Sequence, residues 1–147
     1  MQFKEINQDL FMTNEATAFV HCISADFALG AGIALKFNEL GVRQQLERLY
    51  DKGQWIGSGY LLPVYIGRSF PVFNLVTKER YWDKPTYETL RQSLEALQNH
   101  IQTHYADMIL AMPRIGCGLD RLDWAKVKTI IKDVFRNTDV EIVVCYR

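Results

Sequence analysis

An apolar run at 108–112 leads into a glycine-containing segment, Met112 to Trp124, which leads into an amphipathic helical pattern. This is the order of a strand, a loop and a helix, the junction at which α/β sheets hold their ligands. Gly116 and Gly118 allow a tight turn that brings backbone N–H groups close to an anion, with a helix dipole behind them. Asp120 follows the glycines and is expected to face the ligand. Two glycines at this spacing also fit a plain turn, so neighbouring motifs decide between the two readings.

A second strand, glycine loop and helix precede this one in the chain. A buried strand is predicted at 16–23, and a helical pattern begins near 32. The residues at the helix entrance are Gly30, Ala31, Gly32 and Ile33. Neither Lys-Ser/Thr nor a third glycine follows, so this is neither a P-loop nor a regular dinucleotide-binding loop. If the two strands are neighbours, the two loops line one cleft, and a diphosphate is the ligand best suited to two amide-lined walls.

The hydrophobic pattern of the rest of the chain predicts a mixed α/β fold. The predicted strands are 1–7, 16–23, 60–66, 69–76, 108–112 and 140–146, and the predicted helices are 32–49 with a break at Gly41, 87–105 after Thr86 as N-cap, and 124–135 after Asp123. A turn-rich stretch covers 50–59. This order predicts a mixed sheet between helices, in a single domain that spans residues 1–147.

Composition and charge exclude several classes of function. Seventeen acidic and seventeen basic residues balance, which argues against a broad non-specific binder of polyanions. No signal peptide or membrane-spanning run is present, so we expect a cytoplasmic protein that does not bind membranes. Cys22, Cys117 and Cys145 have no disulfide-framework or zinc-site spacing. His100 and His104 share a helix face without a third ligand, so we expect no metal.

For three side chains, Lys78, Asp9 and Cys117, the sequence alone allows a plain structural reading. Lys78 follows the strand at 69–76 and is either a solvated surface charge, an anion-binding cation or a nucleophile. An ordinary lysine, with a pKa of about 10.4, is nearly all protonated, so nucleophilic attack requires desolvation or a nearby cation. Asp9 fits a turn cap. Cys117, between two glycines, is expected to be a small filler because nothing nearby supplies a base.

Six short motifs, in order along the chain, resemble those of the macrodomains. The resemblance is to the branch of the terminal ADP-ribose protein glycohydrolase and of the macrodomain antitoxins that remove ADP-ribose from DNA. The motifs are Gln-Asp-Leu-Phe at 8–11, His-Cys-Ile-Ser at 21–24, Gly-Ala-Gly-Ile-Ala at 30–34, Thr-Lys at 77–78, Lys-Pro-Thr-Tyr at 84–87, and Met-Pro-Arg-Ile-Gly-Cys-Gly-Leu-Asp at 112–120. Gln8 stands where the family more usually has glycine. The resemblance implies a three-layer α/β/α sandwich with ADP-ribose across the carboxyl ends of the strands.

The resemblance also implies where each part of ADP-ribose binds. Asp9 would bind the adenine amino group, and Leu10 would lie beside the base. Ser24 and the loop at 30–33 would approach the distal ribose and the diphosphate. The opposite wall would be formed by Arg114, Ile115, Gly116, Cys117, Gly118 and Leu119.

By the same resemblance, Lys78 falls on the nucleophilic lysine of the family and Asp120 on its catalytic aspartate. We therefore expect an ADP-ribosyl hydrolase that removes ADP-ribose from acidic side chains, nucleobases or O-acyl esters. Its partners would be ADP-ribose or an ADP-ribosylated protein or DNA, with no cofactor, and the protein is expected to be a monomer. Two alternatives share the pocket: a non-catalytic ADP-ribose-binding module, in which Lys78 only binds charge, and a phosphatase for ADP-ribose 1″-phosphate.

Overall fold

A six-stranded mixed sheet organises the described residues, 1–52, 60–105 and 107–147, of this computed structural model. The strands are β1 (Gln2–Asn7), β2 (Ala18–Ser24), β3 (Tyr60–Ile66), β4 (Phe70–Lys78), β5 (Ile109–Met112) and β6 (Glu141–Tyr146). The helices are α1 (Gly32–Glu39), α2 (Val42–Leu49), α3 (Tyr87–His104) and α4 (Trp124–Val134), with a 3-10 turn, η1, at Leu10–Met12. The predicted order of elements is confirmed. Most of the turn-rich stretch predicted at 50–59 lies outside the described residues.

The strand order brings the two glycine loops together. It is β1-β6-β5-β2-β4-β3, parallel throughout except for the antiparallel β3–β4 hairpin around Gly67. β2 pairs with β5 on one side and with β4 on the other. Because parallel neighbours end at the same edge, the loops after β2 and β5 and the last residue of β4, Lys78, share that edge. The two loop-bearing strands are therefore neighbours, which is the condition that the sequence analysis set for a single cleft.

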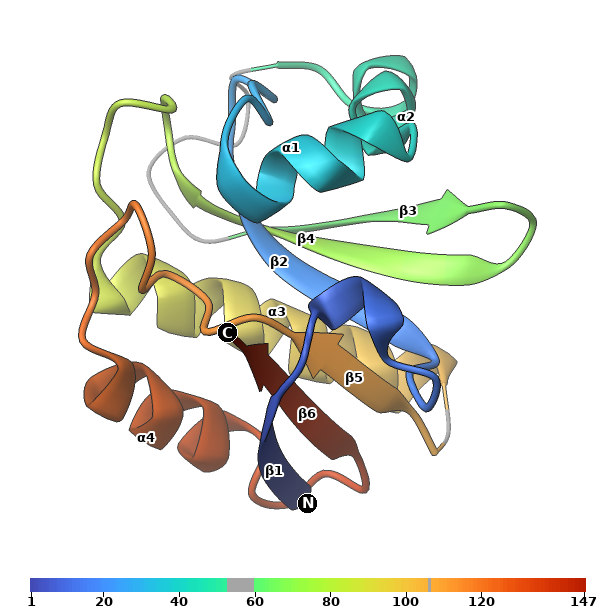
Figure 1. Cartoon of the computed structure of the whole chain (residues 1–147), viewed down its shortest axis with the longest axis vertical. Helices are drawn as coiled ribbons and strands as arrows, with labels where there is room; N and C mark the ends of the chain where they lie inside the picture. The colour runs from blue at the N-terminus through green and yellow to red at the C-terminus, as the bar shows by residue number, and fades with distance from the viewer. Residues whose placement is uncertain (53–59, 106) are drawn as a thin grey trace.

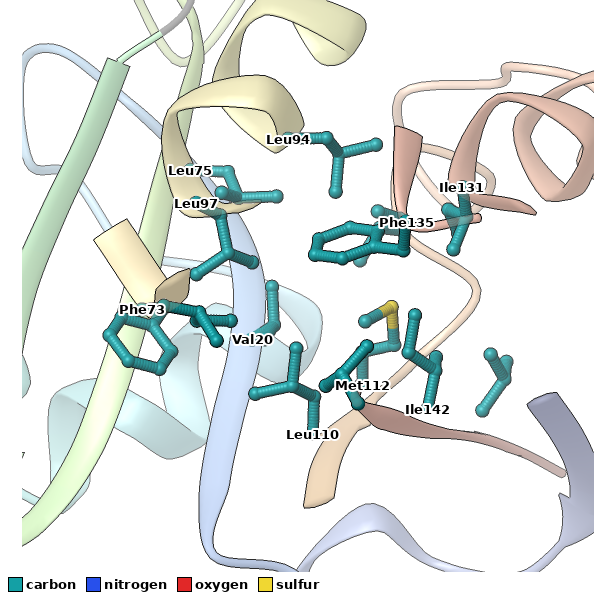
Figure 2. Close-up of a cluster of buried hydrophobic side chains, with 14 of the residues drawn as sticks. Val20, Phe73, Leu75, Leu94, Leu97, Leu110, Met112, Ile131, Phe135 and Ile142 are labelled. Atoms are coloured by element: carbon teal, nitrogen blue, oxygen red, sulfur yellow. The ribbon is translucent and has the colours of Figure 1, made fainter. Parts of the chain in front are cut away.

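Helices cover both faces of the sheet, which gives the three-layer sandwich (Figure 1). α1 and α2 lie on one face, and α3 and α4 lie on the other. Successive strand residues alternate between the two cores: Ile142 and Val144 pack beneath α3 and α4, whereas Val143 packs beneath α1 and α2. Figure 2 shows the α3/α4 side, where Leu94 and Phe135 pack against side chains of the strands.

The helix ends follow the local chemistry of the sequence. Thr86 caps α3 in a capping box with Thr89, and the Asp123 carboxylate accepts the N–H of Ala125 at the start of α4, as predicted for both caps. The break between α1 and α2 falls on Gly41, whose φ of 89° is left-handed. None of the helices in the described ranges is long and apolar enough to cross a membrane.

Candidate active site

A cleft of about 1290 Å³ opens where the parallel strands end. Its floor includes the last residues of β2 and β6, and its walls are the loops that follow β2 and β5. All residues predicted for the site line this cleft: Asp9, Leu10, Ser24, Gly30, Ala31, Gly32, Ile33, Lys78, Arg114, Ile115, Gly116, Cys117, Gly118, Leu119 and Asp120. The structure thus brings them together, and their individual roles stay predictions.

An ion pair joins Lys78 and Asp120 across the cleft. The Lys78 ammonium donates a hydrogen bond to Asp120 Oδ1 at 2.6 Å, although the two residues lie 42 positions apart in the sequence. Their side chains are only 13% and 16% exposed, so solvent screens the attraction weakly. The pair forms because β4 ends at Lys78 while the loop after β5 carries Asp120 toward it. This arrangement places an amine and a carboxylate within proton-transfer distance in a cleft.

The loop after β2 is organised by Asp26, which the sequence analysis did not single out. Its carboxylate accepts the Ser24 hydroxyl at 2.6 Å, the Ala28 N–H at 3.1 Å and the Tyr81 N–H at 3.0 Å. The last bond ties this loop to the segment that follows Lys78. An aspartate whose carboxylate accepts the backbone N–H two residues later forms an Asx-turn, and an aspartate in a loop was the available clue.

The same loop ends in an uncapped helix. α1 starts at Gly32, and its N-cap residue, Ala31, makes no side-chain capping bond. The N-cap therefore supplies no acceptor for the first N–H groups of the helix, and the residues of its first turn, Gly32, Ile33 and Ala34, line the cleft. Gly30 and Ala31 are exposed and line the cleft. Backbone amides of this kind, with the positive end of a helix dipole, suit a phosphate.

The loop after β5 forms the opposite wall and requires glycine at one position. Gly116 has a φ of 74°, and its carbonyl accepts the N–H of Leu122 at 2.8 Å. A Cβ at Gly116 would stand 2.9 Å from Leu122 Cδ1, whereas a Cβ at Gly118 meets no heavy atom within 4 Å. Gly116 is therefore needed to close the turn, and Gly118 leaves open space beside the backbone.

Cys22 and Cys117, which line the cleft, carry thiols that are poor nucleophiles. Burial raises the pKa of Cys22 to about 12 and that of Cys117 to about 11. Both thiols are protonated near neutral pH, and the thiolate is the reactive form. These pKa values support the reading of Cys117 as a filler between two glycines.

Another part of the cleft lining combines η1, near the start of the chain, with the C-terminal residues. Asp9 caps η1 by accepting the Phe11 N–H at 2.9 Å, and its other oxygen accepts Arg147 Nη1 at 3.0 Å. The Arg114 guanidinium lies 4.3 Å from the centre of the Tyr146 ring, a cation–π distance. The turn-cap reading of Asp9 is thus confirmed, while its partner Arg147 was missed because terminal contacts leave no sequence pattern.

His21 is a buried histidine that lines the cleft. Its Nε2 lies 2.5 Å from Asn74 Oδ1, and because the Asn74 amide N–H groups are directed to the Leu62 and Val72 carbonyls, Nε2–H is the donor. Burial lowers the pKa of His21 to about 4, so it is neutral. His100 stacks on His104 outside the cleft, and no group of three metal-ligating side chains occurs among the described residues.

Solved structures of other proteins share this fold. The macrodomain of Mycobacterium tuberculosis DarG is 20% identical, with a TM-score of 0.80, over 99% of this chain and 98% of that one. Thermosipho africanus DarTG in complex with ADP-ribose is 15% identical, with a TM-score of 0.72, over 99% of this chain and 42% of that one. These likenesses define the fold as that of a macrodomain. No protein-family model matches the sequence.

Two curated relatives are much more similar in sequence. The ADP-ribose glycohydrolase OARD1 of Bos taurus is 42% identical over 142 residues, which cover 95% of this chain and 88% of the relative. The ADP-ribose glycohydrolase OARD1 of Homo sapiens is 39% identical over the same share of each chain. The chain therefore belongs to the macrodomain family, in the branch of the terminal ADP-ribose glycohydrolases.

Proposed function

We propose that this protein releases ADP-ribose from carboxylate esters, modified nucleobases or O-acyl groups, with Lys78 as nucleophile and Asp120 as acid and base. Hydrolysis of an ADP-ribosyl bond goes with membership of the family, because relatives 39–42% identical over 95% of this chain are ADP-ribose glycohydrolases. The observation that carries the mechanism is the 2.6 Å ion pair between Lys78 and Asp120, shielded from water inside the cleft.

The cleft offers a place for each part of ADP-ribose. Its diphosphate would lie between the uncapped start of α1 and the loop at 113–119, where backbone N–H groups can offset its charge. Its adenine would lie toward Asp9, whose carboxylate is an acceptor for the amino group. This orientation leaves the distal ribose at the end where Lys78 and Asp120 meet.

In the first chemical step, Asp120 accepts a proton from the Lys78 ammonium, which leaves a neutral amine and a carboxylic acid. The amine attacks the anomeric carbon of the distal ribose, and the bond from that carbon to the acceptor atom breaks, with its electron pair leaving on the acceptor. A carboxylate leaves unprotonated, whereas a nucleobase takes the proton from Asp120. The product is ADP-ribose bound covalently to Lys78 Nζ.

In the second step, water resolves this intermediate. Asp120, as a carboxylate, takes a proton from the water, whose oxygen bonds to the anomeric carbon while the carbon–nitrogen bond breaks and its electron pair returns to Lys78. The proton then passes from Asp120 to the amine and restores the ion pair. For an ester substrate, the proton that Asp120 gained in the first step goes to bulk water before the second step, so one proton is released overall.

The decisive experiment is to trap the intermediate. The protein is incubated with an ADP-ribosylated substrate in the presence of a hydride reductant, which reduces the ring-opened Schiff-base form of the adduct, and is then digested. We expect the mass of reduced ADP-ribose on the peptide that contains Lys78. Lys78→Ala should abolish both adduct and turnover, while calorimetry should find ADP-ribose affinity within about fivefold of wild type. Lys52→Ala, three residues after α2 and outside the cleft, is the matched control. Turnover by Lys78→Ala at the wild-type rate would refute the covalent mechanism.

A panel of substrates separates the possible leaving groups. Wild-type protein is given an ADP-ribosylated glutamate peptide, an ADP-ribosylated oligonucleotide, O-acetyl-ADP-ribose and ADP-ribose 1″-phosphate. Release of ADP-ribose from any of the first three by the wild-type protein, and its loss in Lys78→Ala, supports the proposal. Phosphate release that survives Lys78→Ala, or binding without any turnover, would favour the phosphatase or the non-catalytic binding module instead.

A further inference from the structure

The motif Lys-Pro-Thr-Tyr at 84–87 has no part in the chemistry described above, yet its residues reach the loop that carries Asp120. Lys84 Nζ donates a hydrogen bond to the backbone carbonyl of Leu119 at 2.9 Å. The hydroxyl oxygen of Tyr87 accepts the backbone N–H of Asp123 at 3.0 Å. One contact lies one residue before Asp120 and the other lies three residues after it. The motif therefore holds the loop on both sides of the carboxylate.

The base from which these two side chains extend is itself fixed. Thr86 and Thr89 form the capping box at the start of α3, and Pro85 is buried beside it. The Thr89 hydroxyl also donates to the carbonyl of Thr77 at 2.8 Å, immediately before Lys78 in β4. The start of α3 thus contacts the strand end that carries the amine and, through Lys84 and Tyr87, the loop that carries the carboxylate.

The loop needs support from outside because its own bonds are few. Within 118–123, Arg121 is exposed and has a left-handed φ of 62°, a conformation that residues with a side chain rarely adopt. Arg121 N–H bonds the Gly118 carbonyl at 3.2 Å, and Leu119 is 68% exposed. Burial therefore does little to fix residues 119–121, whereas Leu122 is held by its bond to Gly116 and by packing against the core.

We propose that Lys84 and Tyr87 clamp the 119–123 loop and so hold Asp120 against Lys78 during catalysis. They are positioning residues, because they touch the backbone beside Asp120 rather than the reacting atoms. The proposal rests on the acid–base role given to Asp120 above. General acid–base catalysis depends steeply on distance, and a displacement of about 1 Å can lower a rate about 100-fold.

The test uses Lys84→Met and Tyr87→Phe, which remove the two polar contacts and keep side-chain bulk. We expect each to lower kcat about three- to tenfold and the double variant about 30- to 100-fold, with ADP-ribose affinity within about threefold of wild type. Lys84→Arg keeps a donor and should restore kcat to within about threefold. Lys52→Met and Tyr65→Phe, which lose contacts remote from the cleft, are matched controls and should leave kcat unchanged.

Two further measurements show whether the clamp acts through Asp120. In an Asp120→Asn background, adding Lys84→Met and Tyr87→Phe should lower the residual rate no further. Amide hydrogen exchange of Arg121 and Leu122, whose N–H groups bond the Gly118 and Gly116 carbonyls, should accelerate at least tenfold in the double variant and keep the wild-type rate in the controls.

The outcomes are separable from those of the proposed mechanism. Unchanged exchange at Arg121 and Leu122 in the double variant would show that no clamp exists, whatever the catalytic result. Faster exchange with an unchanged kcat would show that the clamp does not position Asp120, and an equal loss of rate in the Asp120→Asn background would show the same. If instead Asp120→Asn alone keeps the wild-type rate, the proposed mechanism fails, and the exchange experiment still decides whether the loop is clamped.

Discussion

Replacing Gly116 with alanine tests whether the conformation of the loop after β5 requires glycine at this position. The residue has a φ of 74°, and a Cβ there would stand 2.9 Å from Leu122 Cδ1 and 3.5 Å from Leu122 Cγ. Leu122 cannot simply move away, because its N–H bonds the Gly116 carbonyl at 2.8 Å and its side chain packs against the core under α3 and α4. Both backbone strain and steric overlap therefore oppose the substitution.

The size of the effect follows from these two terms. A left-handed conformation costs an alanine about 1–2 kcal/mol, and inserting a methyl group into packed surroundings costs about 1–3 kcal/mol. The lower entropy of an unfolded alanine returns about 0.4–1 kcal/mol. We expect Gly116→Ala to lower the free energy of unfolding by about 3 kcal/mol, which corresponds to a Tm lower by roughly 6–12 °C for a domain of this size.

Denaturant unfolding, a thermal scan and calorimetry with ADP-ribose test this expectation. Gly118→Ala is the control, because a Cβ there meets nothing within 4 Å, and it should change the free energy of unfolding by less than about 0.5 kcal/mol. The double variant Gly116→Ala/Leu122→Ala should lose at least about 1 kcal/mol less free energy of unfolding than the sum of the two single variants, because the overlap between the two side chains is gone. Strict additivity, or a Gly116→Ala protein as stable and as tightly ADP-ribose-binding as wild type, would refute the reasoning.

Three other predictions concern single side chains. Burial lowers the pKa of His21 to about 4 in the folded protein, against an ordinary value of 6.5, so the unfolded state binds the proton first as the pH falls. The free energy of unfolding is therefore full above about pH 6.5 and falls by about 3 kcal/mol as the pH drops toward 4; His21→Gln should flatten this pH dependence, as denaturant unfolding at each pH would show. Cys22 and Cys117, whose pKa values are raised to about 12 and about 11, should react with iodoacetamide at pH 7.5 far more slowly in the folded than in the urea-unfolded protein, as mass spectrometry would show. Asp9→Ala should weaken ADP-ribose binding about tenfold in calorimetry and leave the affinity for the inosine analogue, which has no amino group, within about threefold.

Most of the fold could be predicted because local patterns determine it. The capping signal at Thr86, the break at Gly41 and the alternation of apolar residues in strands all act within a few residues of one another. The pairing of β1 with β6 had no such signal, since their register joins residues more than 130 positions apart. Strand order depends on which hydrophobic faces meet in three dimensions, and periodicity does not encode this.

The part of the site that could be predicted consists of loops rich in glycine and other small residues. The glycines at 116 and 118 and the small residues at 30–32 indicated amide-lined walls, and the strand order then made them one cleft. Asp26 and Arg147 were missed because their roles arise from contacts to backbone or to a distant carboxylate. Such contacts leave no spacing in the chain.

The pairing of Lys78 with Asp120 shows most clearly what sequence alone leaves open. A lysine after a strand and an aspartate after a glycine loop are each common surface residues, and only the resemblance to macrodomains gave the two a shared catalytic role. In the structure, β4 and β5 are the two neighbours of β2, so the end of one strand and the loop after the other converge above the end of β2. Any lysine and aspartate at those two positions of this topology would approach one another. What makes this pair suited to chemistry is that the cleft walls shield both side chains from solvent, while residues 84–89, which lead into α3, contact the backbone beside each of them.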